Sequence, residues 1–308
     1  MNTTVKLKLG TRRSPLAMAQ AEETRARLCK AHGWDESAVE LVPVIASGDK
    51  VQDRPLSEIG GKALWTKELD QWLAEGAIDA SVHSLKDVET VRPEAFTLAA
   101  ILPRADKRDR LVGASSISQL KPGAVVGTSA PRRAAQLLHQ RPDCSVVMFR
   151  GNVATRLSKL AAGEADATFL AAAGLERLGE HGVGHALDPA GWLPAPAQGA
   201  IAVECRANDA ETRELLAAID HEPSRAEVTA ERALLLALGG NCHSAIAVRC
   251  DWEEGELAME AALYSPDGTQ MVQGEARFTA EDTEAPARLA HDLLSRASTA
   301  IRSHFAGE

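Results

Sequence analysis

The sequence has few aromatic residues and no long apolar run. Its 308 residues include five Trp, one Tyr and five Phe, too few for the base-stacking platforms of proteins that bind single-stranded nucleic acid. No stretch of 18 apolar residues occurs, and the first ten residues lack the apolar run of a signal peptide. We therefore expect a cytoplasmic protein that binds neither nucleic acid nor a membrane.

Cysteine is also scarce. The five cysteines are Cys29, Cys144, Cys205, Cys242 and Cys250. They are odd in number and form no CxxC motif, which argues against a disulfide framework and against a structural zinc site. We expect no bound metal, and since no feature indicates an oligomer, we expect a monomer.

Basic residues are outnumbered, but most of them are arginine. The net charge is −9, with 34 Lys and Arg against 43 Asp and Glu, and no lysine follows Lys159. The arginine excess reflects either codon bias or sites that bind carboxylate or phosphate in a bidentate manner. The length corresponds to two or three domains with apolar cores of their own.

Strands and helices alternate in the first half of the chain. The pattern predicts strands over 5–9, 39–46 and 78–83, and helices over 16–31 and 63–75. Such alternation indicates a parallel or mixed sheet that meets ligands at the carboxyl ends of its strands.

The same pattern then recurs. A strand over 124–129 leads into a helix over 132–140, and segment 160–167 matches segment 73–80 at five of eight positions. We interpret this as two similar α/β lobes with mixed sheets hinged around a cleft, as in periplasmic binding proteins. The apolar strand 200–205 would return to the first lobe.

The last ninety residues predict a small α+β domain. A capping box at Ser224 and Glu227 opens a helix that runs to Leu238. Strands over 245–250, 256–264 and 270–278 and a closing helix over 285–303 follow, which indicates a three-stranded antiparallel sheet. The predicted domains are 1–101 with 200–219, then 102–199, then 220–308.

Arginines gather where strands lead into helices. Arg12 and Arg13 lie in the first such loop and Arg132 and Arg133 in its counterpart, while Arg150 and Arg156 flank a Gly-Asn pair. Helix N-termini attract anions, so these loops are candidate anion sites, although any single arginine could be a solvated surface group. Lys62, after two glycines, is either a further cation of the site or an exposed lysine.

Three other positions have alternative interpretations. Asp87 follows a buried strand beside Lys86, and is either an ionised carboxylate that stabilises positive charge or a turn aspartate. His83 fits a half-buried structural histidine better than a base. Cys242 follows a helix C-terminus, whose partial negative charge does not favour a thiolate, so by itself it fits a packing residue.

Taken together, the motifs resemble one family. They are 11–16 (TRRSPL), 60–62 (GGK), 82–88 (VHSLKDV), 127–129 (GTS) with 132–133 (RR), 150–157 (RGNVATRL), 173–177 (AGLER), 198–206 (QGAIAVECR) and 239–242 (GGNC). In this order, and over nearly the whole chain, they resemble the porphobilinogen deaminases, also called hydroxymethylbilane synthases.

The resemblance implies an activity and a cofactor. A dipyrromethane cofactor would be attached to Cys242 by a thioether, and four porphobilinogen units would be added to it with loss of ammonia before hydrolysis releases hydroxymethylbilane. Asp87 would stabilise the cationic azafulvene formed on deamination, with Lys86 and Arg12 as further catalytic residues.

The resemblance also implies binding residues. Those for the cofactor are Cys242, Ser84, Lys86, Asp87, Thr128, Ser129, Arg132, Arg133, Arg150 and Gly151. Those for porphobilinogen and the growing chain are Arg12, Ser14, Lys62, Trp65, Arg156, Arg177 and Gln198. Every pyrrole unit carries an acetate and a propionate, which would account for the arginines.

The sequence departs from the family pattern at a few positions. Ala130 and Pro131 replace a hydroxyl residue and a leucine, Ala197 replaces a glycine, Ala245 a frequent proline, and Trp65 a common phenylalanine. None of these changes removes a charged group or the attachment thiol. Two other hypotheses are a non-catalytic two-lobed anion-binding protein and a carboxylate-recognising transferase with an exogenous cofactor.

Overall fold

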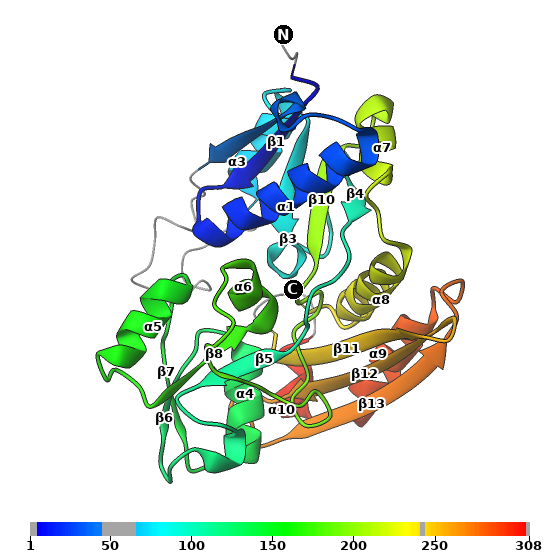
Figure 1. The fold of residues 1–308 in the computed structure, drawn as a ribbon. Helices are drawn as coiled ribbons and strands as arrows, with labels where there is room; N and C mark the ends of the chain where they lie inside the picture. The colour runs from blue at the N-terminus through cyan, green and yellow to red at the C-terminus, as the bar shows by residue number, and fades with distance from the viewer. Residues whose placement is uncertain (1–4, 45–65, 241–243, 306–308) are drawn as a thin grey trace. The chain divides into compact units, whose positions relative to one another are not determined.

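The computed structural model describes residues 5–44, 66–240 and 244–305 (Figure 1). By their contacts the residues form two compact units, one of 1–105 and 200–225 and the other of 106–199 and 226–308. The first unit contains one α/β lobe, the first lobe. The second contains another, the second lobe, together with the C-terminal sheet. The predicted division into three domains stays a prediction.

The first lobe is built on a five-stranded mixed sheet. Its strands are β1 (Leu7–Arg12), β2 (Val39–Val44), β3 (Ala80–Ser84), β4 (Phe96–Ile101) and β10 (Ile201–Arg206), in the order β2-β1-β3-β10-β4. Strand β1 runs parallel to β2 and β3, and β10 runs antiparallel to β3 and β4. The carboxyl ends of β1 to β4 therefore lie at one edge of the sheet, where β10 begins.

Helices complete this lobe. They are α1 (Pro15–His32), α3 (Lys67–Ala74) and α7 (Ala210–Ala217), with short 3-10 turns η1 (Glu36–Ala38) and η3 (Leu85–Asp87). The prediction that the first strand ends at residue 9 is wrong. Strand β1 continues through Arg12 because all its residues pair with β2, and the side chain of Thr11 is fully buried.

The second lobe repeats this architecture, as predicted. Its strands are β5 (Asp109–Val112), β6 (Val125–Gly127), β7 (Ser145–Val147), β8 (Ala167–Ala171) and β9 (His185–Ala186), in the order β7-β6-β8-β5-β9. Its helices are α4 (Pro131–Gln140), α5 (Val153–Ala161) and α6 (Ala172–Arg177), with the 3-10 turn η4 (Ile117–Gln119). Strand β6 is parallel to β7 and β8, and β5 is antiparallel to β8, which confirms two similar lobes with mixed sheets.

Each lobe has an aspartate at the equivalent position, with the same hydrogen bonds to a neighbouring strand. Asp79 Oδ2 accepts a hydrogen bond from Lys8 N at 2.8 Å, and Asp166 Oδ2 accepts one from Val125 N at 2.8 Å. The backbone N–H of each aspartate also donates to the carbonyl of the same partner residue. These aspartates belong to the two segments whose sequences match, so that similarity reports a shared local structure.

The C-terminal part contains the predicted three-stranded antiparallel sheet. Strands β11 (Ile246–Glu253), β12 (Glu256–Tyr264) and β13 (Met271–Phe278) lie in that order and share a core with helices α8 (Glu222–Ala237), α9 (Ala285–Arg296) and α10 (Thr299–Arg302). The single closing helix was wrong, because Ala297 is extended and separates α9 from α10. The prediction of a capping box at Ser224 and Glu227 was also wrong. Helix α8 already begins at Glu222, and the Ser224 hydroxyl accepts a hydrogen bond from Arg104 N.

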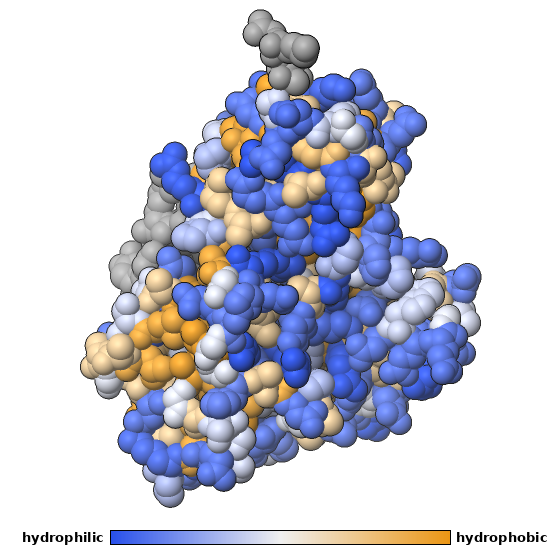
Figure 2. Space-filling view, in the orientation of Figure 1, coloured by the Kyte–Doolittle hydropathy of each residue, from blue (hydrophilic) through white to orange (hydrophobic). Residues whose placement is uncertain are grey.

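Packing joins this sheet to the second lobe. Ala135 of α4 and Leu193 share a buried apolar cluster with Ala262 and Tyr264 of β12. On the face drawn in Figure 2, apolar residues gather over α5 and β7, whereas the surface over β13 is mainly hydrophilic. Among the described residues, no helix combines the length and apolarity needed to span a membrane.

Candidate active site

Two predicted site residues lie where β1 leads into α1. Arg12 is half-buried at the end of β1. Ser14 caps α1, since its Oγ accepts a hydrogen bond from Ala17 N at 3.4 Å, and Thr11 Oγ1 donates to Ala17 O at 3.1 Å. These bonds fix Arg12 close to the positive end of a helix, an arrangement that attracts anions.

Three more predicted site residues lie at the end of β3 and in η3, which follows it. Ser84 Oγ lies 2.8 Å from Gln20 Nε2, so this hydroxyl is tied to α1. Lys86 and Asp87 follow in η3 and are half-buried. Asp87 has no side-chain hydrogen bond or ion pair with another described residue, and its carboxylate is therefore available at the edge of the sheet where strands of this fold class meet ligands.

Arg92 is the centre of a buried network of charged side chains that includes residues of α3, β3 and β10. The sequence did not predict this network. The Arg92 guanidinium pairs with Glu204 at 2.8 Å, Glu89 at 2.8 Å and Asp70 at 2.6 Å. His83 Nε2 is 2.8 Å from Ser81 Oγ and 3.5 Å from Glu204 Oε2. His83 is thus a structural histidine with partners, as its sequence context indicated.

Glu204 in this network should add to the free energy of unfolding near neutral pH and lose that contribution at acid pH. Replacement of Glu204 by Gln should remove the contribution. Burial alone raises the pKa of Glu204, but hydrogen bonds with His83 and Arg92 outweigh it and lower the pKa from 4.5 to about 2. Its stabilising contribution, about 3 kcal/mol, is complete above about pH 4.5 and is lost as the pH falls from there towards 2. The difference in unfolding free energy between wild type and Glu204→Gln, measured with urea, should therefore shrink between pH 6 and pH 3.

The pKa of Asp70 is raised, chiefly by burial, and this has the opposite effect on stability. Glu204 contributes a smaller part of that rise, so Glu204→Gln reduces it and makes the expected trend smaller without reversing it. Glu40→Gln, at an exposed position of β2, is the control and should show no such trend. A wild-type advantage over Glu204→Gln that stays constant from pH 6 to pH 3 would contradict the assignment.

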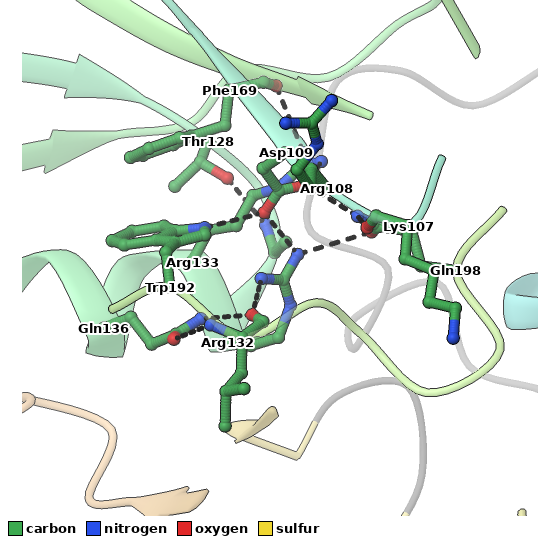
Figure 3. Close-up of polar contacts among 12 residues, drawn as sticks. Lys107, Arg108, Asp109, Thr128, Arg132, Arg133, Gln136, Phe169, Trp192 and Gln198 are labelled. Carbon is green, nitrogen blue, oxygen red and sulfur yellow. Dashed lines mark hydrogen bonds and ion pairs between the residues drawn. The ribbon is translucent and has the colours of Figure 1, made fainter. Parts of the chain in front are cut away.

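In the second lobe, Arg132 and Arg133 meet on one carboxylate (Figure 3). Arg132 Nη2 donates to Asp109 Oδ2 at 2.8 Å, and Arg133 Nη2 donates to Asp109 Oδ1 at 2.7 Å. Trp192 Nε1 and Gln198 Nε2 donate to the same two oxygens at 2.8 and 2.9 Å. We call these five residues the Asp109 cluster, and Arg132 with Arg133 the arginine pair.

The cluster is buried and positively charged. Asp109 is 0 % exposed and each arginine of the pair 5 %. Burial raises the pKa of Asp109, but the two guanidiniums reverse this and hold it well below its usual range. Two cations and one anion leave one positive charge, and the Nε atoms of both arginines are buried without a hydrogen-bond partner among the described residues. Because burying an uncompensated charge is costly, this donor set fits an anionic group such as the carboxylates of dipyrromethane.

The start of α4 lies next to the pair. Thr128 Oγ1 accepts a hydrogen bond from Ala130 N at 3.2 Å, and Ser129 is half-buried. Ala130 occupies the N-cap position without a side-chain cap, and Pro131 opens the helix. The hydroxyl of the resembled family pattern is absent there, and no described side chain caps the helix N-terminus.

The segment before α5 brings together three predicted residues. Arg150 is 8 % exposed. Gly151 has φ of 112°, and a Cβ there would lie 2.6 Å from the Thr155 side chain, so glycine is required. Arg156 Nε donates to Gly151 O at 3.0 Å, which places both arginines at this glycine turn.

Two other predicted substrate ligands of the second lobe are Arg177, the last residue of α6, and Gln198, which precedes β10. Arg177 Nη2 donates to Gly199 O at 3.1 Å. Gln198 is 1 % exposed and donates to Lys107 O as well as to Asp109. Ala197 adopts a positive φ of 57°, which explains why glycine is usual there.

Lys62, Trp65 and Cys242 lie outside the described residues. Ala245 is buried at the start of the C-terminal sheet. The structure thus gathers Arg12, Ser14, Ser84, Lys86 and Asp87 at one edge of the first lobe, and places Arg132, Arg133 and Gln198 in one buried cluster of the second. In the described part of the chain, no three His, Cys, Asp or Glu side chains are arranged to hold a metal ion.

Sequence reasoning missed Asp109. It lies in the charged run 107–110, which is typical of a solvated loop. The alternation of Asp109, Arg110, Leu111 and Val112 was the available signal, since it places Asp109 on the same face as the buried Leu111.

Comparison with known proteins gives the family. Residues 7–214 match the family model "Porphobilinogen deaminase, dipyromethane cofactor binding domain", and residues 225–295 match "Porphobilinogen deaminase, C-terminal domain". A porphobilinogen deaminase of Sphingopyxis alaskensis is 56% identical, covering 97% of this chain and 96% of its own. One of Paracoccus denitrificans is 48% identical, covering 94% of each. Among solved structures, a TRAP periplasmic solute binding protein from Desulfovibrio salexigens aligns with a TM-score of 0.42 and 11% identity, over 71% of this chain and 73% of that one. The chain belongs to the porphobilinogen deaminase family, and it is a transferase of tetrapyrrole biosynthesis that uses a dipyrromethane cofactor.

Proposed function

We propose that the edge of the first lobe acts on porphobilinogen and that the arginine pair holds the cofactor. The observation that carries the first part is the half-buried Asp87 carboxylate, which no other described residue neutralises. When bound, dipyrromethane supplies the primer to which pyrrole units are added. The remaining steps are assigned to side chains of this chain.

Asp87 faces the reacting substrate. As ammonia leaves porphobilinogen, positive charge develops on the pyrrole, and a carboxylate fixed within a short 3-10 turn stabilises that charge without having to reorganise. Arg12 and Lys86, on neighbouring strand ends, bind the acetate and propionate of the same substrate. Ser14 holds the helix end beside Arg12.

The second lobe provides most of the positive charge. The arginine pair, Arg150 and Arg156 bind carboxylates of the cofactor and of the growing chain, together with Thr128, Ser129, Gly151 and Arg177. Each charge-assisted hydrogen bond contributes about 1.5–3 kcal/mol, so a few of them retain the intermediates between additions.

Further parts of the proposal concern Lys62 and Trp65 as substrate ligands, Cys242 as the attachment point, and a monomer that works in the cytoplasm without nucleic-acid or membrane partners. The division into two lobes and a C-terminal domain that carries Cys242 belongs to the same proposal.

Replacing Arg150 by Leu tests this scheme. The purified wild-type protein should release ammonia from porphobilinogen and form hydroxymethylbilane. Because Arg150→Leu removes charge-assisted bonds to carboxylates, its turnover should fall about ten- to a hundredfold. Ammonia release and product absorbance provide the measurement.

Arg302→Leu is the matched control. Arg302 is exposed at the end of α10, and its loss should leave turnover unchanged. Porphobilinogen binding without ammonia release in the wild type would favour a non-catalytic anion-binding protein instead. Normal turnover in Arg150→Leu would remove Arg150 from the site.

A further inference from the structure

We infer that Asp109 is a positioning residue, which holds the arginine pair in the orientation that receives the cofactor's carboxylate. The inference rests on the proposed cofactor-binding role of the pair. It concerns a residue that touches neither substrate nor cofactor and acts only through Arg132 and Arg133.

The bonding of Asp109 leaves it no capacity for a ligand. Oδ2 accepts from Arg132 and Trp192, and Oδ1 accepts from Arg133 and Gln198, all within 2.7–2.9 Å. Four donors use the hydrogen-bonding capacity of both oxygens. Asp109 therefore orients the groups around it and does not itself bind.

Each arginine is also fixed at a second point. Arg132 Nη1 donates to Leu193 O at 2.8 Å, and Arg133 Nη1 donates to Phe169 O at 3.1 Å. Asp109 is thus the shared point of two guanidiniums that are otherwise anchored on different segments. Every Nη atom of the pair thus bonds Asp109 or one of the two carbonyls, whereas the Nε atoms have no partner in the described part of the chain.

The walls of the cluster are rigid. The rings of Trp192 and Phe169 stack with centroids 4.7 Å apart and an interplanar angle of 19°. Gln136 bonds both the N–H and the carbonyl of Leu193. Removing the negative charge would therefore leave two like charges in the same confined space, where they repel each other and lose their common orientation.

Replacing Asp109 by Asn tests the inference without measuring turnover. The apo form is obtained from cells that make no porphobilinogen, and the holo form by adding porphobilinogen. In the wild type, attachment of the cofactor should raise the thermal midpoint, because the carboxylates of the attached cofactor contact the arginines only in the folded state. In Asp109→Asn this rise should shrink to less than half, and loading, followed by intact-protein mass, should slow at least tenfold.

A purely structural role gives a different result. It would lower the midpoints of apo and holo Asp109→Asn equally and leave the loading rate unchanged, which would overturn the inference. Asp220→Asn is the control, since Asp220 pairs with Arg225 through both oxygens, at 2.6 and 2.8 Å. Its two midpoints should fall together.

Trp192→Phe covers the case in which Asp109→Asn does not fold. It removes one donor to Asp109 while keeping an aromatic ring, and loading should slow about fivefold. Wild-type loading by Trp192→Phe would then overturn the inference. Failure of the proposed function is a separate outcome, because the wild type itself would then acquire no adduct and show no rise in midpoint.

Discussion

Replacing Asp87 by Ala should slow ammonia release from porphobilinogen by about 10³-fold and leave the thermal midpoint within about 2 °C of wild type. The carboxylate is half-buried and bonds no other described side chain, so folding loses little when it is removed. The reaction loses the one anion of η3, which is proposed to face the positive charge that develops on the pyrrole as ammonia leaves. Steady-state ammonia release and a thermal melt are the two measurements.

Asp79→Ala is the matched control, because Asp79 lies in the same lobe and its replacement should affect stability and not turnover. Its carboxylate bonds Lys8 N, so its loss should lower the midpoint by a few degrees without slowing turnover. Turnover near the wild-type rate in Asp87→Ala would show that another group stabilises the developing charge. A large fall in its midpoint would instead make Asp87 a structural residue.

Replacing Cys242 by Ser should abolish both the cofactor and the activity. The intact mass of the wild-type protein should exceed that of its polypeptide by two pyrrole units, and the mass of Cys242→Ser should equal the polypeptide alone. The other four cysteines are buried, and burial raises the pKa of Cys29, Cys144 and Cys205. Buried, protonated thiols are poor nucleophiles and should not substitute for Cys242.

Cys29→Ser is the comparison for this experiment. Cys29 Sγ donates to Asp35 O at 3.6 Å, a bond that a serine hydroxyl can also make, so this variant should keep the adduct and its activity. An adduct that persists in Cys242→Ser would place the attachment elsewhere. A wild-type protein that is active without any adduct would rule out the covalent cofactor.

The lobes could be predicted because local signals and tertiary structure agree in them. The match between 73–80 and 160–167 preserves Asp79 and Asp166, which bond Lys8 of β1 and Val125 of β6, the equivalent strands of the two sheets. The helix start at Pro131 was likewise visible, because the fixed φ of proline suits the first turn of a helix. The glycine turn at Gly151 was not predicted and came from the structure.

The Asp109 and Arg92 networks could not be predicted in this way. Their partners come from segments far apart in the chain, such as Asp109 with Trp192 and Arg92 with Glu204. In the sequence each looks like a solvated charge, and only the fold shows that it is buried. The prediction that Ser224 caps a helix failed for a related reason. Its hydroxyl accepts a hydrogen bond from Arg104 N, which belongs to a distant segment of the chain.

The strand orders of the two sheets also determine which lobe can be completed first while the chain is being synthesised. All five strands of the second-lobe sheet lie between residues 109 and 186, so this sheet has every strand it needs once that stretch has left the ribosome. The first-lobe sheet lacks β10, which pairs with β3 and β4, until residue 206 has been made. The N-terminal lobe is therefore completed after the lobe that follows it, and until then the edges of β3 and β4 stay unpaired and open to association with other chains.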